Sequence, residues 1–100
     1  MSDQVTEDPG VAPEMDGLIE EIGRLRAQVA QLEERVGVLE AEQKARSAEL
    51  SDPAVYDDAP RRNKLLTDYQ AAADKLEELT ARWEQAMAEL EAARAALETA

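Results

Sequence analysis

Residues 18–40, LIEEIGRLRAQVAQLEERVGVLE, decide the fold of this chain. Their apolar residues recur in alternating steps of four and three, and most positions between them are polar or small. The stripe runs through Leu18, Ile22, Leu25, Val29, Leu32, Val36 and Leu39, and it resumes at Leu50 after two polar positions, Gln43 and Arg46. This heptad spacing indicates an amphipathic helix whose stripe packs against a second helix.

A second stripe with the same spacing occupies the C-terminal part of the chain. It runs through Leu65, Tyr69, Ala72, Leu76, Leu79, Trp83, Ala86, Leu90, Ala93 and Leu97. When positions whose numbers sum to 115 are paired, each of the ten positions on one stripe meets a position on the other, and Leu32 faces Trp83. Such pairing is typical of two antiparallel helices joined by a short connection.

The connection between the stripes is rich in turn-forming residues. Pro53 disfavours helical geometry in Asp52, the residue before it, and the Asp52 side chain can cap a short new turn. Asp57 or Asp58 can cap the second helix with Pro60 in its first turn, where the missing N–H group costs nothing. The first helix therefore ends before this segment, and the second begins after it.

These patterns predict an all-α fold, a two-helix antiparallel coiled-coil hairpin over residues 15–100. Its arms are expected at about 15–51 and 59–99, with a turn at 52–58. Residues 1–14 are polar, acidic and interrupted by proline and glycine, so we predict a disordered acidic tail there. The residues expected to form the structural core are Leu25, Leu32, Leu39, Leu76, Leu79, Trp83 and Leu90.

The composition limits the chemistry that the chain can perform. It contains no histidine and no cysteine, so the commonest general base, the thiol nucleophile and the soft metal ligands are absent. Carboxylate pairs such as Glu33-Glu34 are expected on exposed helix faces, where they serve solubility rather than catalysis or metal binding. We therefore expect no enzyme activity, no catalytic residue, no cofactor and no metal site.

The same composition indicates a cellular setting. The absence of cysteine fits a reducing cytoplasm, and no apolar run approaches the roughly 18 residues that span a bilayer. The N-terminal residues also lack the apolar core of a signal peptide. We expect a soluble cytoplasmic protein without membrane contact.

The charges are distributed unevenly along the chain. A net charge of −12 opposes broad binding to nucleic acid, because that affinity comes from clustered cations. Residues 44–64 are the exception, with five cations against four acids. Ordinary solvated charge is one interpretation of these cations. In the other, they meet at the hairpin tip and contact nucleic acid or a partner there: Lys44, Arg46, Arg61, Arg62 and Lys64.

Three short motifs in the turn and the second helix point to a known family. They are Asp52-Pro53-Ala54-Val55-Tyr56, Leu76-Glu77-Glu78-Leu79 and Arg82-Trp83-Glu84. Over about residues 30–92 the chain resembles the C-terminal coiled-coil domain of ABC-F ATPases, a two-helix hairpin that follows two ATP-binding cassettes. In some members this domain is implicated in binding DNA or ribosomal RNA. A weaker resemblance, through the Leu50-Ser51-Asp52-Pro53 turn, is to the N-terminal helical domain of bacterial peptide-chain release factors.

The resemblance does not extend to nucleotide hydrolysis, because the chain contains no Gly-x-x-x-x-Gly-Lys-Ser/Thr phosphate loop. We interpret Trp83 as a core anchor against Leu32 rather than a base-stacking group, and Arg82 as an ion-pair partner on the flank of the core.

Three functions remain open on the sequence alone. The leading hypothesis is a non-catalytic interaction module similar to the ABC-F domain, which contacts a protein, the ribosome or nucleic acid through its tip. The second is a homodimeric structural or scaffolding coiled coil, because Leu66, Ala73 and Met87 widen the second stripe. The third is an acidic mimic that binds a basic protein.

Overall fold

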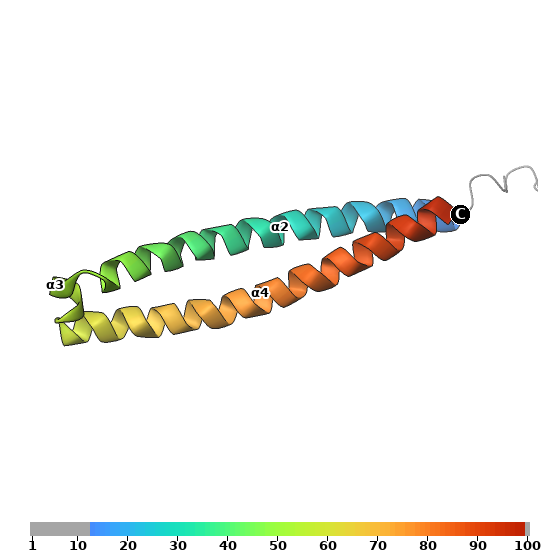
Figure 1. Cartoon of the computed structure of the whole chain (residues 1–100). Helices are drawn as coiled ribbons and strands as arrows, with labels where there is room; N and C mark the ends of the chain where they lie inside the picture. The colour runs from blue at the N-terminus through green and yellow to red at the C-terminus, as the bar shows by residue number, and fades with distance from the viewer. Residues whose placement is uncertain (1–12, 100) are drawn as a thin grey trace, which may run out of the picture. The chain divides into compact units, whose positions relative to one another are not determined.

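The computed structural model describes residues 13–99, and this part of the chain is almost entirely helical. Helix α2 spans Pro13–Leu50, α3 spans Pro53–Tyr56 and α4 spans Ala59–Thr99 (Figure 1). Residues 13–99 contain no strand, and the two long helices pack against each other. The predicted tail lies outside the described residues except for its last two positions, 13 and 14, which belong to α2.

The contacts within the chain divide it into two compact units. The terminal unit combines the described residues up to Ala30 with those from Glu84 onward, and the turn unit spans Gln31–Trp83. Both long helices run through both units, so each unit contains one segment of α2 and one of α4. Within each unit the two segments run in opposite directions (Figure 1).

One apolar cluster holds the terminal unit together. Its buried members come from both long helices and are Ile22, Leu25, Leu90 and Ala93. The partly buried residues packed against them are Leu18, Met87 and Leu97. All except Met87 occupy positions of the two heptad stripes. Burying a side chain of leucine size fully contributes roughly 2 kcal/mol to the free energy of folding, so this cluster stabilises the unit.

Burial follows the two stripes closely. In α2 all ten stripe positions are buried or half-buried, and in α4 nine of ten are. The exception is Tyr69, which is 37% exposed. Of the seven residues expected in the core, the structure buries Leu25, Leu32, Leu79 and Leu90. It half-buries Leu39, Leu76 and Trp83.

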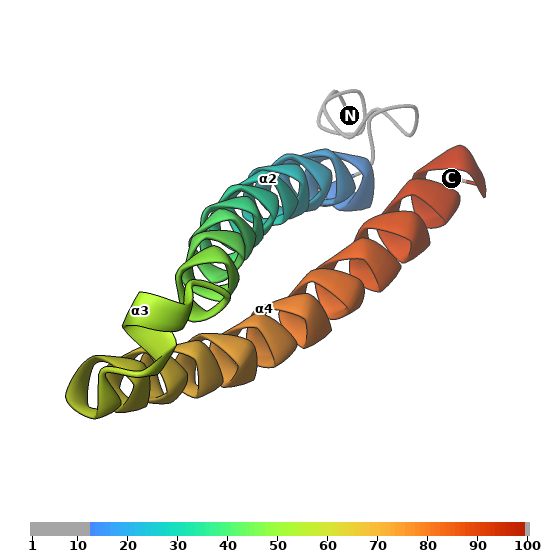
Figure 2. The ribbon, with the colours of Figure 1, turned by 60° about the vertical axis from the view of Figure 1, so that its left-hand side comes forward.

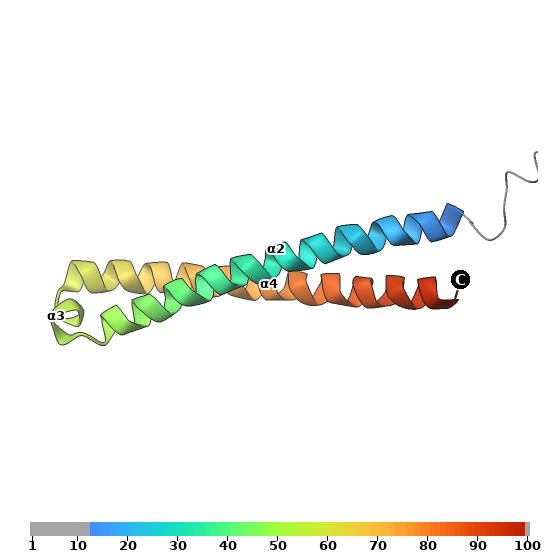
Figure 3. The same ribbon diagram turned by 90° about the horizontal axis from the view of Figure 1, so that it is seen from above.

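The turn unit closes with a short helix, α3, which lies between the end of α2 and the start of α4 (Figures 2 and 3). Asp52 caps α3, because its Oδ1 accepts a hydrogen bond from the backbone N–H of Ala54 at 3.0 Å. Val55 is buried, so the predicted turn also adds to the apolar core. The start of α4 carries the predicted aspartate cap, with the backbone N–H of Arg61 donating to Asp58 Oδ1 at 3.3 Å.

The two polar positions in the stripe of α2 form hydrogen bonds within the turn unit. Gln43 is buried, and its Nε2 donates to the backbone carbonyl of Tyr69 at 2.9 Å. Arg46 Nη1 donates to Gln43 Oε1 at 2.9 Å. No buried side-chain nitrogen or oxygen in the described residues lacks a partner. A shift in helix register would break these bonds, so the polar layer favours a single register.

Candidate interaction surfaces

All five cations expected at the tip lie in the turn unit, near the end of α2 or the start of α4. Two of them form ion pairs with short distances. Arg61 Nη2 lies 2.9 Å from Glu49 Oε1 and so joins α4 to α2. Lys64 Nζ lies 3.1 Å from Asp68 Oδ2, one turn along the same helix. The tip therefore has its own acidic partners for these cations.

Arg46 and Arg62 are held by several contacts each. Arg46 bonds to Gln43, lies 3.7 Å from the Glu42 carboxylate and keeps only 22% of its side chain exposed. Arg62 Nη1 donates to the backbone carbonyl of Tyr56 at 3.0 Å, and its guanidinium carbon lies 5.3 Å from the centre of the Tyr56 ring. This is a cation–π geometry. Both arginines therefore stabilise the turn unit.

The remaining three cations are accessible to a partner. The side chains of Arg61 and Lys64 are 55% and 77% exposed. Lys44 is also exposed, and it forms no ion pair with any residue between 13 and 99. Exposed ion pairs contribute at most about 1 kcal/mol. Arg61 and Lys64 can therefore exchange their carboxylate partners for a phosphate at small cost.

Exposed apolar side chains accompany these cations. Tyr56, Leu66 and Tyr69 are all exposed. Arg62 stacks on Tyr56, and Leu66 follows Arg62 by one turn of α4, on the same side of the helix. Tyr56 was not among the predicted site residues, although an aromatic residue in a polar turn is a signal that could have identified it. We define the tip surface as Lys44, Tyr56, Arg61, Arg62, Lys64 and Leu66.

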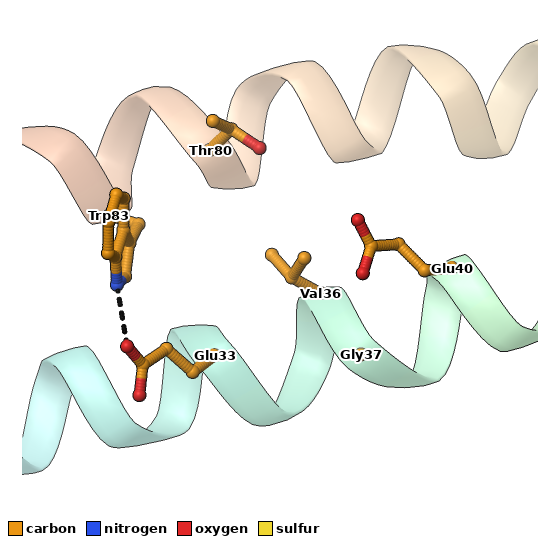
Figure 4. Close-up of a pocket in the computed structure, with 6 residues that line it drawn as sticks. All are labelled: Glu33, Val36, Gly37, Glu40, Thr80 and Trp83. Atoms are coloured by element: carbon orange, nitrogen blue, oxygen red, sulfur yellow. Dashed lines mark hydrogen bonds between the residues drawn. The ribbon is translucent and has the colours of Figure 1, made fainter.

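Trp83 lies at the edge of the helix pair rather than fully inside it. The residue is half-buried, and its Nε1 donates a hydrogen bond to Glu33 Oε2 at 3.1 Å (Figure 4). The sequence predicted an apolar anchor and gave no indication of this polar contact. An indole commonly combines both roles, because its ring is apolar and its N–H group needs a partner.

An open groove of about 320 Å³ adjoins Trp83 in the turn unit. We call it the seam groove, and its lining residues are Glu33, Val36, Gly37 and Glu40 of α2 and Thr80 and Trp83 of α4. Figure 4 shows the side chains of Val36 and Glu40 extending from α2 toward α4. The groove therefore has an apolar middle and a carboxylate near each end.

The charged residue beside Trp83 has a structural role in α4. Arg82 Nη2 lies 3.7 Å from Glu78 Oε2, and Lys75 Nζ donates to Glu78 Oε1 at 2.9 Å. The hydrogen bond and charge of Lys75, followed by the charge of Arg82, lower the pKa of Glu78 below its ordinary value. The prediction that Arg82 is an ion-pair partner is confirmed.

The described helices carry no metal cluster and no membrane span. Between residues 13 and 99, no three His, Cys, Asp or Glu side chains come close enough together to hold a metal ion. Neither long helix, over its described length, contains an apolar stretch that could cross a bilayer.

Comparison with known proteins gives one match. A family model described as ABC transporter C-terminal domain matches residues 24–86. This segment contains all three motifs found in the turn and the second helix, so the resemblance inferred from them is confirmed. No curated protein and no solved structure matches the chain.

Proposed function

Since this chain belongs to the ABC transporter C-terminal domain family, we propose that it is a non-catalytic interaction module that contacts single-stranded nucleic acid through its tip surface. The observation that carries the proposal is the pairing of exposed cations with an exposed aromatic residue in the one part of an acidic chain that is not negative. We also place the protein in the cytoplasm, which suits a chain without cysteine.

In this proposal, the three accessible cations of the tip surface contact the phosphates of the nucleic acid. Lys44, Arg61 and Lys64 are exposed, and a phosphate can replace the weak carboxylate partners of the latter two. Phosphate contacts fix position without reading sequence. The proposed binding is therefore tolerant of sequence and confined to the tip.

In this proposal, the ring of Tyr56 contacts the bases of the nucleic acid. Its ring is exposed, and Arg62 already lies over it at 5.3 Å, so the arginine orients the ring and supplies a second planar surface. Unstacked bases pack on such aromatic and guanidinium planes in proteins that bind single strands. Single-stranded RNA is accordingly the first ligand to test.

The test is the affinity of a fluorescent single-stranded RNA for the chain, measured by anisotropy at several salt concentrations. With three exchangeable cations, we expect the logarithm of the binding constant to fall against the logarithm of salt with a slope of about −2. Reversing Lys44, Arg61 and Lys64 to glutamate removes these contacts and is expected to abolish binding.

The matched control reverses three arginines of the terminal unit, Arg24, Arg26 and Arg94, and so changes the net charge equally. This control is expected to retain most of the RNA affinity, with helix content in both variants checked by circular dichroism. Equal loss in the two variants would show that only net charge matters and would reject the tip. Absence of RNA binding by the unmodified chain would reject the function.

A further inference from the structure

We propose that the seam groove beside Trp83 binds an arginine or lysine side chain from a basic protein partner. This inference is independent of the tip surface, because none of the residues that line the groove belongs to that surface. It therefore gives the chain a second interaction site, for a different class of macromolecule.

The groove has the shape for a long cationic side chain. Its lining spans one heptad of α2, from Glu33 to Glu40, which corresponds to about 10 Å of helix. Val36 lies between the two carboxylates, and the indole of Trp83 lies beside Glu33 at one end, so the groove offers apolar surface on which a methylene stem can pack. A groove of this length suits one or two side chains rather than a whole helix.

The two carboxylates of the groove have no ion-pair partner in the part of the chain that the structure describes. Among residues 13–99, no lysine or arginine forms an ion pair with Glu33 or Glu40. Glu33 accepts a hydrogen bond from the indole N–H of Trp83, but that donor is neutral and leaves the negative charge uncompensated. A guanidinium or ammonium group would meet charged acceptors here and, beside them, the half-buried face of an indole.

Charge complementarity selects the occupant. The two carboxylates repel a phosphate, and a second copy of this chain would bring a further net charge of −12. A basic protein segment is attracted both by the overall charge and by the groove itself. We therefore assign the groove to such a segment rather than to nucleic acid or to self-association.

Gly37 provides a way to close the groove without disturbing the fold. A Cβ atom added at this glycine meets no heavy atom within 4 Å. Replacing glycine inside a helix also raises helix stability, by up to about 1 kcal/mol for alanine. The substitution Gly37→Leu places a larger side chain in the lining of the groove and is expected to obstruct it, and circular dichroism checks that the variant keeps its helix content.

The experiment titrates the chain with a hexa-arginine peptide by calorimetry and follows Trp83, the only tryptophan, by fluorescence. The peptide is expected to bind and to change the Trp83 emission. Gly37→Leu is expected to weaken binding by about tenfold, the effect of losing roughly one charge-assisted contact. Gly17→Leu is the matched control, because Gly17 is equally open and does not line the groove.

A second comparison of variants tests whether the peptide binds in the groove or is attracted only by the net negative charge of the chain. Glu33→Gln with Glu40→Gln is compared with Glu20→Gln with Glu91→Gln, since both double variants lower the net negative charge equally. Glutamine at position 33 still offers an oxygen to the Trp83 N–H.

Loss of peptide affinity in the Glu33/Glu40 double variant alone supports the groove. Equal loss in both pairs, unchanged binding by Gly37→Leu, or unchanged Trp83 emission on peptide binding would overturn the inference.

Discussion

Replacing Leu79 with alanine is expected to lower the free energy of unfolding by about 3.5 kcal/mol, the middle of the range for a buried leucine. Leu79 has no exposed surface, and it lies in the stripe of α4 within the turn unit. The alanine variant loses the transfer free energy of the removed side-chain atoms. It also leaves a cavity, because the two packed helices relax only in part around the smaller residue. Urea unfolding followed by circular dichroism measures the change.

Leu66→Ala is the control for Leu79→Ala. It is the same substitution in the same helix and unit, at a position that remains exposed. Its cost is expected to stay below about 1 kcal/mol. If the two variants lost the same stability, Leu79 would not be buried in the seam, and the packing described for the turn unit would be wrong.

Replacing Ala86 with leucine is expected to lower the free energy of unfolding by about 2 kcal/mol, although leucine is the more apolar residue. Ala86 is 2% exposed, and Ala93, another small residue of the same α4 segment, belongs to the buried cluster of the terminal unit. A larger side chain forces the helices apart or adopts a strained rotamer. The sign of the effect is informative, because burial of apolar area alone predicts stabilisation.

Ala92→Leu provides the comparison for Ala86→Leu. Ala92 lies on the same helix segment but is exposed, so the larger side chain has room. Its effect on the free energy of unfolding is expected to stay within about 0.5 kcal/mol. The same denaturation measurement serves both variants. A gain in stability for Ala86→Leu would mean that the two helices are not in close contact at this level.

Much of the fold is readable from the sequence because a heptad pattern determines which helix face is buried. Between residues 15 and 50, every buried residue of α2 belongs to the stripe that starts at Leu18, including the polar Gln43. Helix caps follow equally local rules, and Asp52 and Asp58 both act as predicted. Periodicity and capping depend on neighbours within a few residues, so no tertiary information is needed.

The turn unit shows where this local reasoning ends. Val55 is buried and Tyr56 exposed, yet both lie in a segment too short to have a periodic pattern. Leu39 and Leu76 belong to the stripes but are only half-buried, and the helices of this unit lie farther apart near α3 (Figure 1). Heptad spacing predicts which face of each helix is buried, but it does not specify the distance between the helices.

The candidate sites were harder to predict than the fold for a related reason. The sequence identified the cations of the tip, but it could not show that Arg62 stacks on Tyr56 or that Arg61 pairs with Glu49 across the two helices. The seam groove likewise depends on residues from both helices. These contacts depend on the orientation of individual side chains, which the register between the two helices does not determine.

Both proposed surfaces depend on the claim that each chain buries its own stripes, so the most direct test is the molar mass in solution. Light scattering over a dilution series is expected to give the 11.0 kDa of a single chain at every concentration, with Trp83 emission unchanged. A mass of two chains that falls on dilution, together with loss of helix content, would contradict the account. The stripes would then pair between chains, and a homodimeric scaffold would be the better description.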